Sequence, residues 1–129
     1  MRLLRFCKMG IIKCIRFILG YLIVVLNFVC RPKQKNRSQL EQERVDQETK
    51  QLTLYQFYLC PFCVRVRRMI YRLGLSIEYR DAKNNEIHRQ ELLTEGGRIK
   101  VPCLRIEEAS GTRWLYESRA INAYLSEKF

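Results

Sequence analysis

Two cysteines separated by a proline and a phenylalanine, Cys60-Pro61-Phe62-Cys63, are the feature that most constrains how this chain can fold. They follow residues 52–58, an apolar stretch with strand character, and they begin a stretch with helical periodicity. One face of that helix is expected to hold Phe62, Val66, Met69, Ile70 and Leu73. Proline suits the first helical position, because its φ angle is already helical and no amide hydrogen is needed there. The sequence therefore predicts a strand, a sharp turn and a helix that begins at the motif.

The position of Cys60 predicts a reactive thiol. Amide groups at the start of a helix lack helical partners and lie at the positive end of the helix dipole. Such surroundings favour the thiolate, so the pKa of Cys60 should fall below its ordinary value of about 8.5. Cys63 follows by one helical turn and can form a disulfide with Cys60. We interpret the motif as a redox-active dithiol, with Cys60 and Cys63 as the catalytic pair.

Other uses of the cysteine pair are less well supported. A structural zinc ion needs four ligands, and outside the basic N-terminal segment only Cys103 and His88 remain, so no metal site is expected. A structural disulfide across so short a loop would constrain the unfolded chain very little. Two inert core cysteines would be ordinary inside a buried helix, but not beside a proline at its start. His88 is expected to be an exposed helical residue and not a base.

The net charge of +11 comes mostly from the first 38 residues, which carry nine basic side chains and no acidic one. These bases flank residues 17–30, FILGYLIVVLNFVC, which carry no charge. An anionic membrane surface is therefore a better partner for this segment than nucleic acid. Residues 51–129 are closer to charge balance and are long enough for one small core.

The apolar run predicts a membrane anchor. Residues 17–30 alone make a helix of about 21 Å, shorter than the hydrocarbon core of about 30 Å. Extension back to Gly10 gives sufficient length, since Lys13 and Arg16 can reach the headgroups. A cleaved signal peptide is not favoured because no small-residue cleavage site follows, and an interfacial helix is not favoured because residues 17–30 are apolar all round. We predict that residues 1–31 form an anchor helix that crosses the inner (plasma) membrane once, with residues 10–30 in contact with lipid.

The flanking sequence leaves two properties of this anchor open. Five basic residues precede the apolar run and four follow it, so the positive-inside rule does not specify its orientation. Acylation of Cys7, Cys14 or Cys30 is also open. Residues 32–50 are polar and free of aromatic side chains, which predicts a tether, with a frayed helix over 38–50 as an alternative.

Residues 51–129 predict a single α/β domain with the element order β-α-β-α-β-β-α. Beyond the first strand and helix, strands are expected at 75–81, 101–106 and 112–116, and helices at 86–95 and from 117 onward. A short βαβ unit gives two parallel strands, and the hairpin adds antiparallel ones.

Three spaced motifs in residues 52–129 resemble those of glutaredoxins, thioredoxin-fold oxidoreductases that use glutathione. Cys60-Pro61-Phe62-Cys63 is similar to the family's C-P-Y-C, and Lys100-Val101-Pro102 is similar to its T-V-P turn. Leu115-Tyr116-Glu117-Ser118 resembles the acidic-serine pair of glutaredoxin-like and glutathione-transferase N-terminal domains. The resemblance covers the whole domain and is strongest to bacterial glutaredoxin-like proteins, some of which carry an N-terminal apolar segment. It implies a thioredoxin-like fold with a four-stranded mixed sheet.

The resemblance also implies a glutathione site. Pro102 should follow a cis peptide bond and turn the backbone of Val101 toward the active cysteine, where it can pair with glutathione. Glu117 and Ser118 should bind the γ-glutamyl ammonium and carboxylate, respectively. Arg65 should pair with the glycine carboxylate and lower the pKa of Cys60, with Arg98 as a second candidate.

Two residues depart from the family pattern. Lys100 stands in place of the usual threonine, and Cys103 is an additional thiol that we expect to be buried and not catalytic.

The function implied by the resemblance is reduction of protein–glutathione mixed disulfides, with Cys60 as nucleophile and Cys63 as resolving thiol. Glutathione would be a co-substrate, no cofactor would be tightly bound, and the partners would be glutathionylated or disulfide-containing proteins. The chain would be a monomer with its domain in the cytoplasm. Two alternatives stay open: a module that holds a [2Fe–2S] cluster with glutathione between two copies, and a glutathione-binding domain without turnover.

Overall fold

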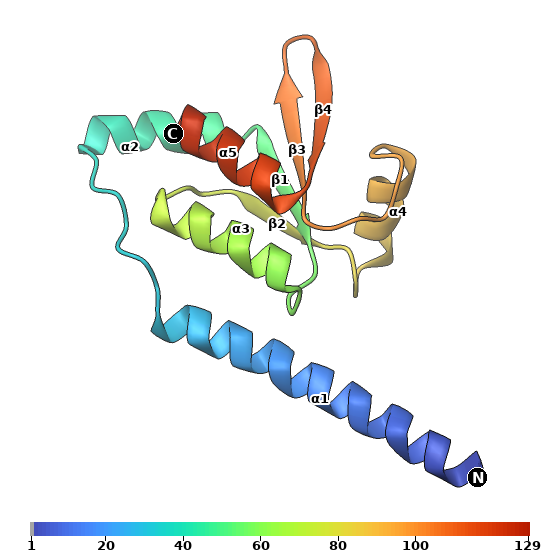
Figure 1. The fold of residues 1–129 in the computed structure, drawn as a ribbon. Helices are drawn as coiled ribbons and strands as arrows, with labels where there is room; N and C mark the ends of the chain where they lie inside the picture. Colours follow the sequence, from blue (N-terminus) through green and yellow to red (C-terminus); the bar gives the residue numbers. More distant parts are fainter. Residues whose placement is uncertain (1) are drawn as a thin grey trace.

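The computed structural model describes residues 2–129, and it describes side chains from residue 10 onward. An N-terminal helix extends away from an α/β unit that contains all four strands and contacts this unit near the helix's C-terminal end (Figure 1). The elements are α1 (Arg2–Val29), α2 (Gln39–Thr49), β1 (Leu52–Gln56), α3 (Pro61–Arg72), β2 (Glu78–Asp81), α4 (Glu86–Thr94), β3 (Cys103–Glu108), β4 (Gly111–Tyr116) and α5 (Ser118–Lys128).

The four strands form one mixed sheet in the order β2-β1-β3-β4. β1 pairs in parallel with β2 and antiparallel with β3, and β3 pairs antiparallel with β4. All five residues of β1 are buried, because β1 is a central strand with helices over both of its faces. This topology confirms the predicted α/β fold with a four-stranded mixed sheet.

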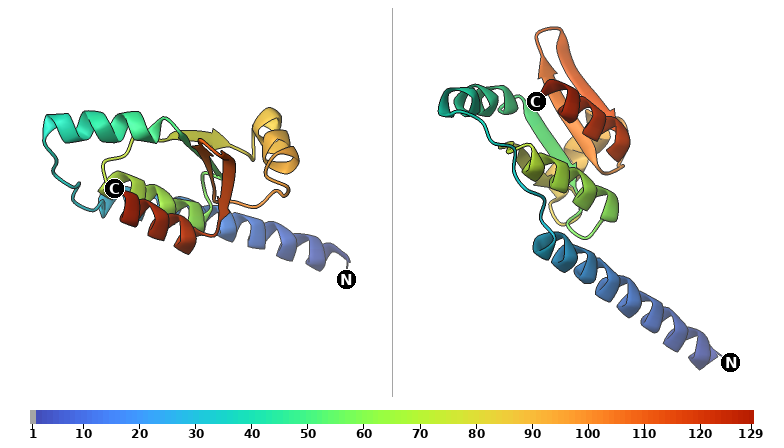
Figure 2. Two further views of the ribbon diagram at one scale, coloured as in Figure 1. Left: turned by 90° about the horizontal axis from the view of Figure 1, so that it is seen from above. Right: turned by 60° about the vertical axis from the view of Figure 1, so that its left-hand side comes forward.

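Helices cover both faces of the sheet (Figure 2). The sheet separates the core into two clusters, one on each face. On one face α3 and α5 lie side by side and contribute Val66, Ile70, Ile121 and Leu125 to the larger cluster. On the other face α4 contributes Leu92 to a smaller cluster around the buried ring of Tyr55. The two faces of the sheet are thus filled by alternate residues of the same strands, as Leu54 and Tyr55 illustrate.

Three local expectations need correction. β2 begins only at Glu78, although the preceding Leu75 and Ile77 are buried in the core as loop residues. β3 begins at Cys103 rather than 101, since Pro102 has no amide hydrogen to donate to a neighbouring strand. Phe62 lies outside the buried stripe of α3, with 61% of its surface exposed.

The segment from 32 to 50 is not a free tether; it contains α2, in agreement with the alternative of a helix over 38–50, and it packs against the domain. Ser38 caps α2 by accepting a hydrogen bond from the amide of Glu41 at 3.3 Å. Val45 packs against the larger core cluster, and Thr49 is fully buried. Arg37 donates to the carbonyl oxygen of Leu73 and, at 2.9 Å, to that of Phe129. The polar composition of this segment predicted a tether, because it did not indicate that one apolar side chain, that of Val45, packs against the core.

The C-terminal half of α1 packs against α3 and the loop that precedes it. Gly20 is buried, and a Cβ atom at this position would lie 3.3 Å from the side chain of Leu59. The guanidinium of Arg31 lies 4.5 Å from the ring centroid of Phe28 and 4.7 Å from that of Tyr71, which joins the end of α1 to α3. Within the described chain, Gly10–Val29 is long and apolar enough to cross a membrane, with a mean hydropathy of 2.0.

Replacement of Val45 by aspartate should lower the free energy of unfolding by about 2 kcal/mol, because a carboxylate would replace an apolar contact with the core. Leu40→Asp is the matched control on the same helix, since Leu40 is 80% exposed. Urea unfolding in detergent micelles measures both variants. Equal stability of the two variants would contradict the packing of α2 on the domain.

Candidate active site

The fold places Cys60 at the junction between β1 and α3. Cys60 is the N-cap of α3, with extended backbone angles of −71° and 124°, and Pro61 occupies the first helical position. The amide of Cys60 donates to the carbonyl oxygen of Phe57 at 3.2 Å, and its own carbonyl accepts from Val64 at 2.9 Å. Cys60 is half-buried, whereas Cys63 one turn later is fully buried. Of the two thiols in the motif, Cys60 alone is therefore accessible to a bulky reactant.

The surroundings of Cys60 lower its pKa to about 6. The largest cause is a hydrogen bond from the Cys63 thiol, and partial burial acts in the opposite direction. Hydrogen bonds from the backbone amides of Cys63 and Phe62 and the charge of Arg67 also favour the thiolate. Most of Cys60 is thus ionised at neutral pH, as the helix-start argument predicts.

Cys63 is electrostatically opposite to Cys60. Its hydrogen bond to the Cys60 thiolate and its burial raise its pKa, so Cys63 stays a protonated donor while Cys60 is ionised. Two thiols that look equivalent in the sequence are therefore a thiolate and the protonated thiol that donates a hydrogen bond to it.

The arginine that acts on Cys60 is Arg67, and this corrects the role expected for Arg65 in lowering the pKa. Arg67 donates to the side chain of Gln56 at the end of β1 and, at 2.7 Å, to the carbonyl oxygen of Tyr58. These contacts hold its guanidinium under the motif loop. Arg65 is exposed and points instead toward a neighbouring cavity.

That cavity, of about 730 Å³, adjoins the first turn of α3. It collects the five residues that the resemblance assigned to glutathione first, although not the second candidate Arg98, and the sequence separates these five by up to 53 positions. Its lining is Phe62, Arg65, Lys100, Val101, Pro102, Glu117, Ser118, Arg119 and Ala120. The volume lies within the range of about 300–1,000 Å³ that is typical of small-molecule sites.

The wall opposite α3 is built from the Val101–Pro102 turn and the first turn of α5. The Val101–Pro102 peptide bond is cis, as predicted. Ser118, Arg119 and Ala120 begin α5, so the free amides at this helix start lie beside the cavity. A carboxylate placed there would meet both amide donors and the positive end of the helix dipole.

Glu117 and Lys100 form an ion pair at the edge of the cavity, a contact that the sequence did not predict. Lys100 lowers the pKa of the Glu117 carboxyl by this hydrogen bond and by its charge. Glu117 also has a φ angle of 72°, a conformation that costs a residue other than glycine energy and is common at ligand sites. The replacement of threonine by Lys100, a departure from the family pattern, was the available signal for this ion pair.

The remaining candidates lie outside the cavity. Arg98 lies over the ring of Tyr116, 4.4 Å from its centroid, and does not line the cavity. Cys103 is fully buried, and burial raises its pKa to about 12, which agrees with the expected inert role.

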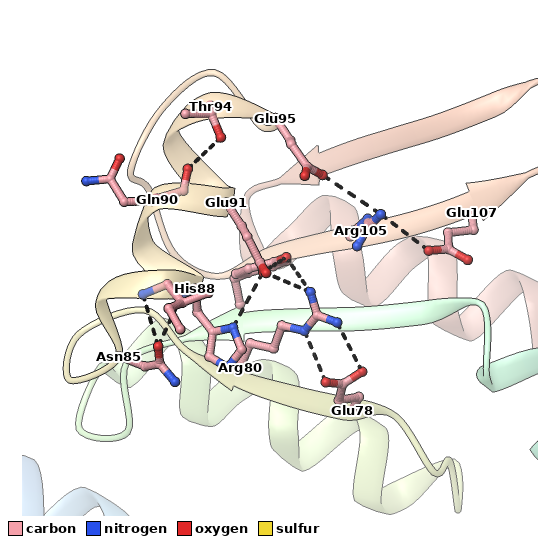
Figure 3. A network of polar contacts seen from close by, with 12 residues as sticks. Glu78, Arg80, Asn85, His88, Gln90, Glu91, Thr94, Glu95, Arg105 and Glu107 are labelled. Atoms are coloured by element: carbon pink, nitrogen blue, oxygen red, sulfur yellow. Dashed lines mark hydrogen bonds and ion pairs between the residues drawn. The ribbon is translucent and has the colours of Figure 1, made fainter.

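His88 is half-buried instead of exposed, and it belongs to a polar network between α4 and β2 (Figure 3). Its Nδ1 atom lies 3.4 Å from a carboxylate oxygen of Glu91, which Arg80 also binds at 2.9 Å. Glu91 accepts a further hydrogen bond from Tyr55 at 2.9 Å. The network fixes α4 to the sheet and leaves His88 away from the thiols.

Comparison with protein families identifies residues 54–129 as a match to the family model "Glutathione S-transferase, N-terminal domain". The matched region runs from β1 through α5 and includes both cysteines and the whole cavity lining. The chain belongs to this family. Its domain is a thioredoxin-like glutathione S-transferase N-terminal domain, preceded by an apolar helix. The expected resemblance is therefore right at the level of the superfamily, while the family model is that of the transferase N-terminal domain and not of glutaredoxin.

Among solved structures, this glutathione S-transferase N-terminal domain is similar to maleylacetoacetate isomerase from Anaeromyxobacter dehalogenans 2CP-1. The structure of that protein with bound glutathione is 29% identical, with a TM-score of 0.47, over 60% of this chain and 37% of that chain. The structure with bound dicarboxyethyl glutathione and citrate is 30% identical, with a TM-score of 0.47, over 60% and 36%. The chain thus spans little more than a third of the isomerase. A comparison with curated proteins gave no match.

Replacement of Arg67 by glutamine should raise the pKa of Cys60 by about half a pH unit, because a partly exposed charge pair contributes less than about 1 kcal/mol. Alkylation by iodoacetamide, followed against pH, should show a midpoint near 6 in the unmodified protein. Arg65→Gln is the matched control and should keep that midpoint. A shift in the Arg65 variant alone would contradict the assignment of Arg67.

Proposed function

We propose that this protein is a glutathione-dependent thiol–disulfide oxidoreductase of the glutaredoxin type. The observation that carries the proposal is an accessible Cys60 with a lowered pKa at the start of α3, two residues before Phe62, which lines the cavity. A thiolate at neutral pH is the nucleophile needed for disulfide exchange. Family membership supports glutathione as the molecule that the cavity binds.

In the first half-reaction the Cys60 thiolate attacks the glutathione sulfur of a protein–glutathione mixed disulfide. The bond between Cys60 and the glutathione sulfur forms as the protein–glutathione disulfide bond breaks, and the protein leaves as a thiolate. Cys60 is then glutathionylated, and the glutathione moiety occupies the cavity. The Cys63 thiol stabilises the attacking thiolate by its hydrogen bond until the new bond forms.

Two routes return Cys60 to the thiolate. A second glutathione thiolate can attack the glutathione sulfur on Cys60, which releases oxidised glutathione and the free Cys60. Alternatively, Cys63 loses its proton to solvent and attacks Cys60, which releases glutathione and forms a Cys60–Cys63 disulfide. Two further glutathione molecules would then reduce that disulfide. The burial of Cys63 favours the first route for mixed disulfides of glutathione.

The cavity lining supports a specific orientation for glutathione. The amides at the start of α5 and the hydroxyl of Ser118 would bind the γ-glutamyl carboxylate. Glu117 would bind the ammonium group, in competition with Lys100, and Arg65 would bind the glycine carboxylate. The backbone of Val101, set by the cis bond to Pro102, would pair with the cysteinyl residue of glutathione.

A second candidate function is glutathione transfer or isomerisation, which the family assignment favours. In that chemistry the thiolate of bound glutathione is the nucleophile, and the protein thiols take no part. Two further alternatives are a glutathione-ligated [2Fe–2S] cluster shared by two copies and glutathione binding without turnover. If the protein held a cluster, it would be coloured when purified without oxygen. If it were a binding domain without turnover, it would bind glutathione without consuming it.

We also propose that the protein is attached to the cytoplasmic side of the inner (plasma) membrane by α1. The apolar length and the exposure of Gly10–Val29, only 6% of which is buried, support attachment to lipid. The reducing glutathione pool of the cytoplasm supports that side, because the second half-reaction consumes reduced glutathione. Partners would then be glutathionylated or disulfide-containing proteins near the membrane.

Cys60→Ser should abolish reduction of a glutathionylated peptide in the presence of excess glutathione, whereas Cys63→Ser should keep most of that activity. External glutathione can replace Cys63 as the resolving thiol, but nothing replaces the attacking one. Production of oxidised glutathione, coupled to glutathione reductase, measures both variants. A comparable loss of activity in both variants would refute the glutathione route and favour a dithiol cycle. Full activity of Cys60→Ser in an assay of glutathione conjugation would favour transferase chemistry.

Glu117→Gln should raise the KM for the glutathionylated peptide about two- to fivefold with little change in kcat, because an exposed ionic contact to the substrate is lost. Glu127→Gln, on the exposed side of the same helix, is the matched control and should leave KM unchanged. A fall in kcat with constant KM would exclude a binding role for Glu117.

A further inference from the structure

We propose that α1 lies along the surface of an anionic membrane, in one leaflet, instead of crossing the bilayer. The inference deepens the membrane attachment proposed above and does not depend on the glutathione chemistry. It rests on a difference between the two sides of α1, because the domain packs against only one of them.

One face of α1 carries its described charges and its contacts with the domain. Lys13, Arg16, Gly20, Val24 and Asn27 follow one another at spacings of three and four residues, so they lie along one side of the helix. Gly20 is buried against Leu59, and Val24 and Asn27 are partly covered by the domain. The side that would be polar in an amphipathic helix is thus occupied by two bases and then by the folded domain.

The opposite face is a continuous, uncovered apolar stripe. Its members also repeat at spacings of three and four, and each is about half exposed or more: Ile11 57%, Ile15 48%, Ile18 66%, Leu22 48%, Val25 55% and Val29 73%. Phe17, Tyr21 and Phe28 widen the stripe on one flank. Ile12, Leu19 and Leu26 on the other flank are also about half exposed, so the domain covers only the side of α1 that holds Gly20, Val24 and Asn27.

With α1 packed against the domain, the helix is poorly suited to cross the whole bilayer. From Gly20 onward one side of α1 packs against the domain, so only residues 10–19 of the apolar segment are free of the domain on every side. Ten residues make a helix of about 15 Å, half the thickness of the hydrocarbon core. Deeper insertion would carry Arg65 and Arg68, which line a cavity with Ile23 and Leu26 of α1, into the hydrocarbon. Charged side chains at that depth are strongly disfavoured.

The charges fit an anionic surface. Residues 1–38 carry no acidic side chain, and none of the ion pairs among the described residues involves Lys13, Arg16 or Arg31. With the apolar stripe in the acyl region, the helix axis lies at headgroup depth, where Lys13 and Arg16 can reach lipid phosphates. The domain then rests on the cytoplasmic side of α1, and Leu59 brings the neighbouring Cys60 close to the membrane surface.

The depth of the stripe distinguishes the two arrangements. In a Trp114→Phe background, which removes the single native tryptophan, one tryptophan is placed at Ile11, Ile18, Leu22 or Val29 of the full chain. Fluorescence quenching by lipids brominated at different acyl positions then measures each depth, in vesicles with 30% anionic lipid. A helix along the surface gives similar, shallow depths at all four positions. A helix across the bilayer gives the greatest depth at Ile18 and Leu22 and shallow depths at both ends, which would overturn the inference.

A second set of variants tests whether the basic residues of α1 contribute to membrane binding. Lys13→Gln with Arg16→Gln should weaken binding to the anionic vesicles about thirtyfold, the factor that corresponds to about 1 kcal/mol for each base at the surface. Lys50→Gln with Lys83→Gln removes the same charge from exposed positions outside α1 and should leave binding unchanged. Equal effects of the two pairs would refute the assignment of these bases to the surface.

Two other outcomes would also overturn the inference. Failure of the unmodified protein to bind vesicles would remove the membrane attachment itself, while leaving the peptide-reduction assay unaffected. Dimerisation through the apolar stripe in the presence of lipid, detected by cross-linking, would make a second copy of the chain the occupant of this face.

Discussion

The pairing of β1 with strands on both sides is the constraint on which the site depends. Because β2 and β3 hold all five residues of β1 inside the sheet, the chain must leave the sheet after Gln56 and turn into α3 at a fixed place. Pro61 allows the helix to begin immediately, so the preceding residue becomes its N-cap. A cysteine at that position has backbone amides and a neighbouring thiol directed at its sulfur. The reactivity of Cys60 is thus a consequence of strand pairing as much as of the motif.

The proposed site combines two kinds of electrostatic support. Fixed donors in α3 hold the thiolate, and they need no ligand to do so. The second group lies across the cavity, where Lys100 pairs with the strained Glu117 beside the start of α5. A ligand that bears an ammonium group and a carboxylate could exchange with this ion pair at low cost, because both partners are exposed to solvent. The arrangement therefore suits a zwitterionic ligand better than a simple anion.

The N-terminal segment is not an independent helix, because α1 contacts the domain. An isolated helix of this composition would be a candidate for crossing a bilayer, and Gly10–Val29 satisfies length and hydropathy. Gly20 lets the helix approach Leu59 closely, and the stacking of Arg31 between Phe28 and Tyr71 secures its end. These contacts bind one face of the helix to α3, which begins directly after Cys60. The proposed membrane attachment would therefore be coupled to the position of the Cys60 thiol through a single interface.

The sequence by itself determined the element order of residues 52–129, the βα position of the cysteine pair and, through the family resemblance, five of the nine residues that line the cavity. Periodicity and the placement of proline are local properties, so Pro61 marked the start of α3 without tertiary information. The choice between Arg65 and Arg67, the ion pair of Lys100 with Glu117 and the docking of α2 through Val45 were decided only by the tertiary structure. Each depends on which side chains from distant segments meet, and periodicity along one segment carries no information on that. The same reason explains α1, because the sequence of its apolar segment did not indicate which side packs against the domain at Leu59.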